Sequence, residues 1–386
     1  MGNANAVSRV RYVNFARAAE RYRDEIAVTL ARVVESGVYI GGTEVAAFEC
    51  AFADYCGTAH AVGVASGTAA LELTLRAWGV GPGDEVIVPA NTAIPTALAA
   101  AHAGARVVPV DVEADTGLID LRAVEAALTS ATRVIVPVHI YGHPVDMDRL
   151  AELARRAGVR VLEDAAHAHG ALYHGRRCGG LADAAAFSFY PTKNLGAFGD
   201  AGCITTNDAQ LAAALRQLRN LGATGGYDHA VAGYNSRLDP LHAAVLRWKL
   251  THLDGWNERR RELAAIYRAE LEELDALTLP AVRDWALPVW HAFAIRVHGG
   301  QRDALERELA AQEIETNVHY RVPIHLQSCF ADQAWRRGDY PVSEARANEL
   351  LSLPLDPLHT PHEIARVAGA VRTALERLRE ANASAR

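Results

Sequence analysis

The sequence predicts an α/β protein with a mostly parallel, seven-stranded, doubly wound sheet in a larger domain and a smaller α+β domain after it. Three observations predict this class. Short apolar runs rich in Val and Ile recur between residues 60 and 206, helical patterns separate the earlier runs, and the pattern changes after Pro240. A chain of 386 residues is long enough for two domains. We expect the larger domain to span residues 1–250 and the smaller one residues 251–386.

The apolar runs are expected to be buried strands because they are short and continuous. Helical patterns between strands are typical of a parallel sheet with helices on both faces. A glycine-rich loop instead of a helix joins the last two runs, so the sheet can take an antiparallel strand there. The predicted strands are 61–66, 85–90, 106–111, 133–138, 159–164, 184–190 and 202–206, and the predicted helices between them are 68–78, 95–104, 119–128 and 146–158.

The remaining segments complete the two domains. The first 56 residues read as mostly helical. Residues 241–274 have the pattern of one long amphipathic helix that crosses from the first domain to the second. The expected elements of the smaller domain are a strand at 289–297, a helix at 301–312, a strand-loop at 316–327 and a last helix that starts near His362.

Composition excludes several classes of function. The formal net charge is −7 and no long Lys or Arg run interrupts it, so no nucleic-acid partner is expected. No apolar run is long enough to span a membrane. The five cysteines are scattered and form no C-x-x-C pair, which favours a reduced compartment. The N-terminus has no apolar leader, and Ala6 stands where myristoylation needs Ser or Thr. We expect a soluble, cytoplasmic protein.

Polar residues follow several predicted strands at the edge where doubly wound sheets bind ligands. Ser66, Gly67 and Thr68 open a helix directly after a strand. A helix N-terminus with a glycine can hold a phosphate group, although an ordinary N-cap explains the same residues. The chain has no G-x-G-x-x-G or Walker motif here, which argues against a dinucleotide or a nucleoside triphosphate.

Asp164 and Lys193 form the second candidate set. Asp164 ends a predicted strand, and Lys193 follows the next one within FSFYPTKNLGAFGDAG. A carboxylate for a pyridinium nitrogen and a lysine for an aldehyde are the groups that pyridoxal phosphate needs most, and Ser188 can offer a hydroxyl to its phosphate. The plainer alternatives are that Asp164 caps a turn and that Lys193 extends into solvent.

Histidines suggest a competing metal site. His139, His143, His167 and His169 come close to Asp164 in the sequence or at neighbouring strand ends. Their spacings match no standard ligand pattern, and buried or capping histidines are common. We therefore predict no metal.

The chain resembles the DegT/StrS sugar aminotransferases, which are fold-type-I pyridoxal phosphate enzymes. The resemblance rests on ASGTAALELTL, GDEVIVPANT, VHIYGHPVDMDRL, LEDAAHAHGA, FSFYPTKNLGAFGDAG, GYNSRLDPLHAAVL and HYRVPIHLQ, in family order over nearly the whole chain. It implies that Lys193 binds the cofactor aldehyde covalently and that Asp164 pairs with the pyridine nitrogen. It further implies a homodimer with shared active sites. The phosphate-binding residues that it implies are Gly67, Thr68, Ser188 and, from the neighbouring subunit, Asn235.

Two positions depart from the commoner family pattern. His167 stands where many members have Gln, and a histidine there can still bond the phenolic oxygen of the cofactor. Ala93 stands where an aromatic side chain usually stacks on the pyridine ring, so what covers that face is open. Lys193 is present, whereas members that have become dehydratases have lost the lysine. The resemblance therefore implies transamination.

The resemblance also implies a substrate class. HYRVPIHLQ looks most like members that act on nucleotide-linked keto sugars, with Tyr320, Arg321 and His325 as candidate substrate-binding residues. A plain strand-loop explains these three residues equally well. Glutamate or glutamine is the implied donor, and the keto group can be at the third or fourth carbon. A keto cyclitol of the scyllo-inosose type, a cofactor-binding regulatory protein without turnover and a metal-dependent hydrolase remain as alternatives.

Overall fold

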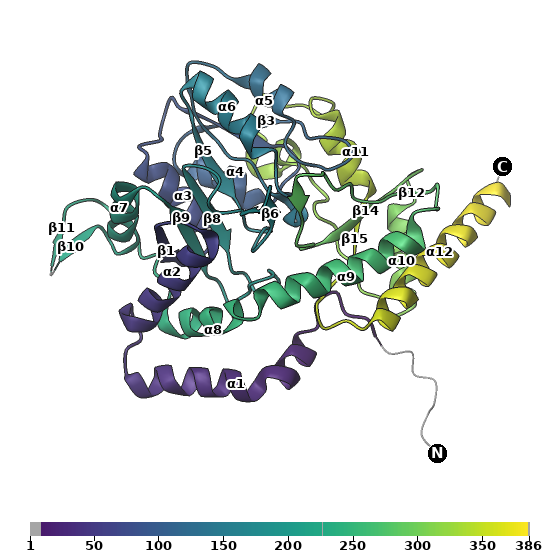
Figure 1. The fold of residues 1–386 in the computed structure, drawn as a ribbon. Coiled ribbons are helices and arrows are strands. Elements are labelled where there is room, and N and C mark those ends of the chain that lie inside the picture. The colour runs from purple at the N-terminus through teal and green to yellow at the C-terminus, as the bar shows by residue number, and fades with distance from the viewer. Residues whose placement is uncertain (1–8, 226, 385–386) are drawn as a thin grey trace.

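The computed structural model describes residues 9–225 and 227–384 (Figure 1). Ala6, on which the myristoylation interpretation rests, lies outside the described residues. The central element is a seven-stranded sheet with the strand order β1-β9-β8-β5-β4-β2-β3. Its strands are β1 (His60–Val64), β2 (Glu85–Pro89), β3 (Arg106–Val110), β4 (Thr132–Ile135), β5 (Arg160–Asp164), β8 (Ala184–Ser188) and β9 (Gly202–Thr206). All seven predicted strands are confirmed within a few residues.

The sheet is parallel except for one strand. β5 pairs parallel with β8 through Leu162↔Ala184 and Asp164↔Ala186, whereas β9 runs antiparallel to both β8 and β1. The connection between β8 and β9 (residues 189–201) contains no helix, which agrees with antiparallel pairing, because parallel neighbours need a crossover that is usually helical. The predicted antiparallel member is therefore confirmed. The carboxyl ends of β1, β2, β4, β5 and β8 meet at one edge.

Helices cover both faces of this sheet. One face carries α3, α4 and α7, whose contacts with one another and with β8 and β9 enclose an apolar core that includes Val62, Leu71 and Leu162. The other face carries α2, α5, α6 and α8. The helices are α2 (Gly42–Cys56), α3 (Gly67–Ala77), α4 (Ile94–His102), α5 (Leu121–Ala127), α6 (Met147–Ala157), α7 (Ala209–Arg219) and α8 (Pro240–Leu250). The four predicted crossover helices are confirmed, and α7 is an additional helix.

The predicted long helix over residues 241–274 is wrong in one respect, since it is divided. α8 ends at Leu250, and α9 spans Leu253–Leu271. The backbone N–H groups of Thr251 and His252 donate to carbonyls three residues back, at 3.2 and 3.0 Å, and the Thr251 hydroxyl also donates to the Trp248 carbonyl at 2.7 Å. These tight turns interrupt the α-helical hydrogen-bond ladder.

A second, smaller sheet follows, in the order β12-β14-β15. It packs with the α9, α10 and α12 helices (Figure 1). The predicted strand at 289–297, the helix at 301–312 and the last helix are confirmed as β14, α10 and α12, while residues 316–327 contain a short 3-10 turn instead of a strand. The bounds are β12 (Leu277–Thr278), β14 (Phe293–Val297), β15 (Leu350–Leu353), α10 (Arg302–Ala311), η2 (Ile324–Leu326), η3 (Ser328–Phe330), α11 (Pro341–Glu349) and α12 (Pro361–Ser384).

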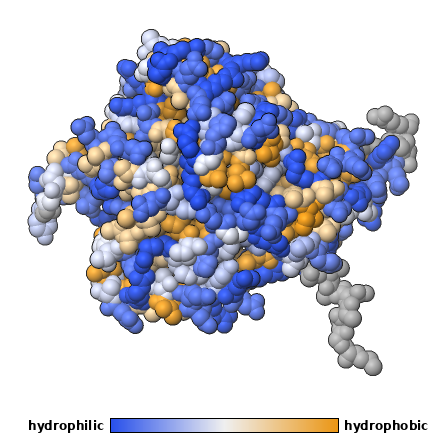
Figure 2. All heavy atoms as spheres, in the orientation of Figure 1, coloured by the Kyte–Doolittle hydropathy of each residue, from blue (hydrophilic) through white to orange (hydrophobic). Residues whose placement is uncertain are grey.

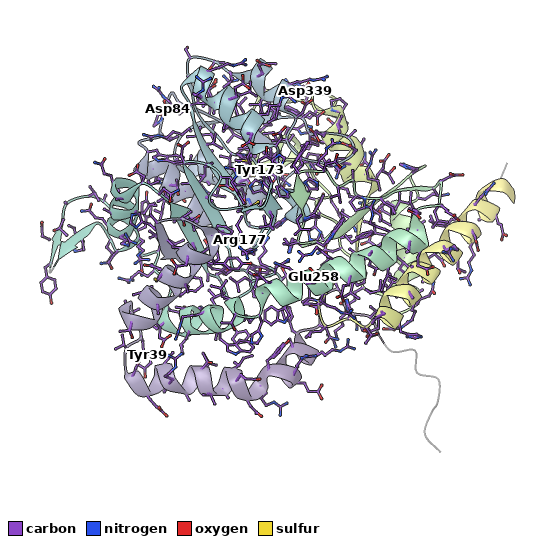
Figure 3. The ribbon with its side chains drawn as sticks, viewed as in Figure 1. Tyr39, Asp84, Tyr173, Arg177, Glu258 and Asp339 are labelled. Atoms are coloured by element: carbon purple, nitrogen blue, oxygen red, sulfur yellow. The ribbon has the colours of Figure 1, made fainter. Side chains whose placement is uncertain are left out.

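Several contacts join the two parts of the chain. β13 (Ala286–Leu287) pairs with β6 (Leu172–Tyr173), which pairs with β7 (Arg176–Arg177). Arg177, labelled near the centre of Figure 3, lies 3.9 Å from the ring centroid of Tyr55 and donates to Asp254 in α9 at 2.8 Å. Because α9 and β13 both bind the larger part, the boundary between residues 250 and 251 stays a prediction.

Two elements stand away from the body. α1 (Phe15–Ser36) lies across α8 along the lower edge of Figure 1, and the β10–β11 hairpin (Ala223–Gly225 and Asp228–His229) projects at the left. Hydrophobic atoms appear on the outer surface along α1 and the turn after it (Figure 2), where Val28, Val34 and Ile40 are exposed. No helix among the described residues is long and apolar enough to cross a bilayer.

Candidate active site

A cavity of about 270 Å³ lies at the carboxyl edge of the large sheet. It is formed by residues at or after the ends of five different strands, β1, β2, β4, β5 and β8, as expected for a doubly wound fold. The lining includes Gly67, Thr68, Asp164, His167, Ser188 and Lys193, together with Ser66, Thr92, Ala93, Pro95, Thr96, Tyr190 and Asp200. Six of the ten predicted site residues therefore come together in one cavity.

One end of the cavity is built from the N-terminus of α3. Ser66 is the N-cap, and its hydroxyl accepts from the Ala69 N–H at 3.1 Å. The N–H groups of Gly67 and Thr68 have no intrahelical partner, because the first turn of a helix lacks preceding carbonyls. Ser188 lies directly against this turn, and a Cβ on Gly67 would come within 2.5 Å of the Ser188 Cβ. Only glycine lets the start of α3 approach the end of β8 this closely, and the free N–H groups and the Ser188 hydroxyl therefore belong to one end of the cavity lining.

Asp164 lines the cavity from the last position of β5. Its Oδ2 accepts from the Thr96 hydroxyl at 2.8 Å, and its Oδ1 accepts from the Ala166 N–H at 3.2 Å. Burial raises the pKa of this carboxyl, and the Thr96 and Ala166 donors and the Lys193 charge oppose that rise. Asp164 is 4% exposed, so its charge is felt strongly by any group placed in the cavity.

Lys193 reaches the same cavity from the loop between β8 and β9. The Lys193 N–H donates to the Tyr190 carbonyl at 2.8 Å. Its neighbour Asn194 anchors the loop, since Asn194 Nδ2 donates to Asn257 Oδ1 and to the Val289 carbonyl, both at 2.9 Å. Burial lowers the pKa of Lys193 to about 8, and the charge of Asp164 partly opposes this. A substantial fraction of the amine is therefore neutral, and so nucleophilic, near physiological pH.

His167 lies beside Lys193 and connects the cavity to the smaller sheet. Its Nδ1 accepts from the Tyr141 N–H at 3.2 Å, and its Nε2 lies 3.3 Å from the Tyr320 hydroxyl. The His291 ring lies 4.2 Å from the His167 ring, centroid to centroid. Burial lowers the pKa of His167 well below its usual value, and the Lys193 charge acts in the same direction. Tyr320 is thus the one predicted substrate-binding residue that contacts the lining of the cavity.

The other three predicted residues lie away from the cavity. Asn235 is exposed, and its Oδ1 accepts from Arg237 at 2.8 Å. Arg321 is exposed and pairs with Asp303 and Glu306 on α10. His325 is buried, with its Nε2 2.9 Å from Glu344 Oε1.

The histidines considered as metal ligands are separated. Among the described residues, His139, Glu163 and Cys178 place potential ligand atoms within 4.8 Å of one another. His139 Nε2 lies 3.0 Å from Glu163, and the same carboxylate accepts from the N–H groups of residues 179, 181 and 182. These bonds already use both carboxylate oxygens, so the cluster is a hydrogen-bond network inside the core.

A comparison with models of known protein families identifies the family of this chain. The model of the DegT/DnrJ/EryC1/StrS aminotransferase family matches residues 20–372. The chain belongs to this family. The resemblance inferred from the sequence motifs is confirmed, and the protein is an aminotransferase.

Individual relatives of this aminotransferase match it over nearly their full length. The dTDP-3-amino-3,4,6-trideoxy-alpha-D-glucose transaminase of Streptomyces venezuelae is 48% identical and aligns over 99% of this chain and 100% of its own. The dTDP-3-amino-3,6-dideoxy-alpha-D-galactopyranose transaminase of Aneurinibacillus thermoaerophilus is 45% identical over 91% of this chain and 95% of its own. The crystal structure of S. venezuelae DesV in complex with a ketimine intermediate has a TM-score of 0.92 at 49% identity, covering 95% and 98% of the two chains. The fold-type-I class is confirmed.

Ala93 is one of the two positions of this aminotransferase at which the sequence motifs depart from the commoner family pattern. Ala93 lines the cavity and is the N-cap of α4. Pro95 and Thr96 follow it on the same wall, and Thr96 is the residue that binds Asp164. Sequence reasoning did not identify Thr96, although its place in the first turn of α4, shortly after the end of β2, was the available signal.

Proposed function

We propose that this aminotransferase uses pyridoxal 5'-phosphate to transfer an amino group from glutamate or glutamine to the keto group at carbon 3 of a dTDP-linked deoxysugar. The observation that carries the proposal is that Lys193, Asp164 and the α3 N-terminus face one cavity of about 270 Å³. The names of the two relatives, each a transaminase of a dTDP-3-amino deoxysugar, support the substrate.

The residues present fit the cofactor. The close approach of Gly67 and Ser188 leaves a concave end where a Cβ would intrude, and a helix N-terminus favours a phosphate there. Asp164 lines another part of the same cavity. It is buried, and hydrogen bonds hold both of its Oδ atoms in place. Gly67, Thr68 and Ser188 would hold the phosphate, and Asp164 would hold the ring nitrogen.

Three side chains of the protein would then have separate roles in the reaction. Pyridoxal phosphate, when bound, carries the amino group between donor and acceptor and withdraws electrons from the reacting carbon. Asp164 would keep a proton on the ring nitrogen, because a buried carboxylate stabilises a neighbouring cation. Lys193 would bind the aldehyde, and its freed Nζ would move a proton at the reacting carbon. The His167 Nε2–H would donate to the phenolic oxygen.

Tyr320 is the best-supported contact for the acceptor sugar, since its hydroxyl lies 3.3 Å from His167. Arg321 and His325 are proposed as further contacts, each of which needs a change of partner. Arg321 would first have to leave its partners Asp303 and Glu306 to reach a diphosphate, and His325 would have to leave Glu344.

We further propose a homodimer in the cytoplasm. Val28 and Val34 on α1 and Ile40 just after it are 71%, 55% and 61% exposed, and exposed apolar patches are typical of protein–protein interfaces. Asn235 lies on the surface near the base of the projecting hairpin instead of at its own cavity, which suits a role in a neighbouring subunit. All five cysteines are free thiols, in agreement with a reducing compartment.

The test is a screen of amino acceptors and donors in the amine-releasing direction. Purified protein with pyridoxal phosphate and 2-oxoglutarate should form glutamate from a dTDP-3-amino deoxysugar, and Lys193→Ala should not. Faster turnover of a 4-amino sugar nucleotide or an amino cyclitol would overturn the proposed substrate. If neither glutamate nor glutamine converts bound pyridoxal phosphate to pyridoxamine phosphate, the regulatory alternative is favoured.

A further inference from the structure

Tyr141 touches three of the histidine-containing segments around the cavity, although it does not line the cavity itself. Its N–H donates to His167 Nδ1 at 3.2 Å. Its carbonyl accepts from the His291 N–H at 2.9 Å. Its hydroxyl donates to the His319 carbonyl at 2.6 Å. One side chain and its own peptide groups thus connect the segment after β5, the segment before β14 and the segment before η2.

The backbone of this residue is held in an unusual conformation. Tyr141 has φ 57° and ψ 10° within the turn η1 (Ile140–Gly142). This left-handed conformation costs free energy for a residue with a Cβ. The neighbouring Gly142 is packed so closely that a Cβ would lie 2.7 Å from Val289 and 2.9 Å from the His167 carbonyl. The turn is therefore fixed against the two segments that it joins.

The N–H of Tyr141 determines how His167 is protonated. A neutral imidazole has one nitrogen that accepts and one that donates. Because Nδ1 accepts from Tyr141, the proton is on Nε2, the nitrogen that lies 3.3 Å from the Tyr320 hydroxyl. Tyr141 is 5% exposed and His167 is 3% exposed, so water does not compete for this bond.

The hydroxyl of Tyr141 positions Tyr320, the second partner of the His167–Tyr320 contact. His319 directly precedes Tyr320, and the Tyr141 hydroxyl holds the His319 carbonyl. The His319 ring is fixed separately, since its Nδ1 lies 2.9 Å from the Ser352 hydroxyl. Burial raises the pKa of Tyr141, and the nearby Arg346 guanidinium opposes this rise. The hydroxyl is consequently a neutral donor to the carbonyl at physiological pH.

We propose that Tyr141 is a positioning residue that sets both partners of the His167–Tyr320 contact, giving His167 an Nε2–H that faces the cofactor cavity and holding Tyr320 opposite it. The assignment rests on the proposed function only in that this contact borders the cofactor and the acceptor sugar. The placement of the two groups is a property of the chain alone.

The first test is a matched pair of hydroxyl deletions. Tyr141→Phe removes the hydroxyl and keeps the N–H, and Tyr267→Phe deletes a second buried hydroxyl that donates to a carbonyl, that of Pro354, at 2.8 Å. Both variants should lose a similar amount of thermal stability. Only Tyr141→Phe should lower kcat or weaken pyridoxal phosphate binding, by about fivefold to tenfold. In a Tyr320→Phe background the Tyr141→Phe effect should vanish; equal effects in both backgrounds would overturn the positioning role.

The second test needs no cofactor and no activity. Long-range ¹H–¹⁵N NMR of histidine-labelled, cofactor-free protein reports which imidazole nitrogen carries the proton, and His167→Gln assigns the signal. The proposal predicts a neutral His167 with Nε2–H from pH 6 to 8. A proton on Nδ1, or titration within that range, would overturn it. A protein that fails to bind pyridoxal phosphate would instead refute the proposed function and leave this measurement decisive for Tyr141.

Discussion

The chain has only two lysines, and the regions around them differ in a way that identifies the reactive one. Lys193 lines both the cavity and a neighbouring groove of about 620 Å³ between α1, α8 and α9, whereas Lys249 in α8 lines the groove and not the cavity. Burial lowers the pKa of both to about 8. The Lys249 amine already has interaction partners, since its Nζ donates to the Gly196 carbonyl at 2.6 Å and lies 4.7 Å from the Phe198 ring centroid. Lys193 faces the Asp164 charge instead.

A lowered pKa therefore does not by itself mark a catalytic lysine. The surroundings do: the groove at Lys249 is walled by aromatic side chains such as Tyr22, Trp248 and Trp256, whereas the cavity at Lys193 holds a buried carboxylate and a helix N-terminus. The aromatic groove favours apolar packing, whereas the cavity with its buried carboxylate favours binding of a charged ligand and catalysis.

The largest expected difference is between deletions of the two amines. Lys193→Ala should lower turnover by about a thousandfold or more, because the covalent and proton-transfer role is lost. Lys249→Ala should keep activity within about tenfold and lower thermal stability, because the Gly196 carbonyl loses its donor. Steady-state rates and thermal melts of the two variants measure this, and an inactive but folded Lys249→Ala protein would contradict the comparison.

Removal of the charge opposite Lys193 should give the next largest effect. Asp164→Asn keeps the shape and cannot stabilise a cation, so we expect turnover to fall by about a hundredfold. Thr96→Val, which removes only the hydrogen bond to Asp164 Oδ2, should cost about tenfold or less. Equal losses in the two variants would show that the carboxylate acts only as a structural acceptor.

The phosphate end can be tested with two glycines. Gly67→Ala places a Cβ 2.5 Å from the Ser188 Cβ and should weaken cofactor binding by about tenfold or more. The control is Gly255→Ala in α9, where a Cβ would meet no atom within 4 Å. That variant should bind normally and be slightly more stable, because alanine favours helix. A titration with pyridoxal phosphate followed by absorbance distinguishes the two variants. Unchanged binding by Gly67→Ala would show that the start of α3 does not bind the phosphate.

The smallest effect is a pH dependence of stability. The folded pKa of Lys193, about 8, lies below its ordinary value of 10.5, so burial of the ammonium destabilises the cofactor-free fold at pH 7. This penalty decreases as pH rises from 8 toward 10.5, where the unfolded chain also loses its proton. Lys193→Met should thus be more stable than wild type by about 1–3 kcal/mol at pH 7, and the gain should shrink by pH 9.5. Urea unfolding at both pH values measures it, and a constant difference would be contrary to the shift.

The sequence was sufficient where local patterns carry the information. Strand ends placed Asp164, Ser188 and the residues after β1 at one edge, because parallel strands share that edge. It was insufficient where partners come from distant segments. The acidic partners of Arg321 lie 15 and 18 residues earlier on α10, and no periodicity links them to the HYRVPIHLQ motif. Likewise the break after Leu250 comes from hydrogen bonds of Thr251, which the amphipathic pattern does not reveal.

Tyr141 shows a different limit. Two of its three contacts use backbone groups, so side-chain chemistry in the sequence gives no signal for them. α7 was absent from the prediction although its residues have a helical pattern and an Asp208 N-cap.

Reduction with borohydride after addition of pyridoxal phosphate, followed by peptide mass spectrometry, tests the central claim most directly. With only two lysines in the chain, the outcome is unambiguous once the N-terminal amine is mapped as well. The account predicts one pyridoxyl group per chain, on Lys193. A label on Lys249 instead, or no label in a folded protein, would contradict it.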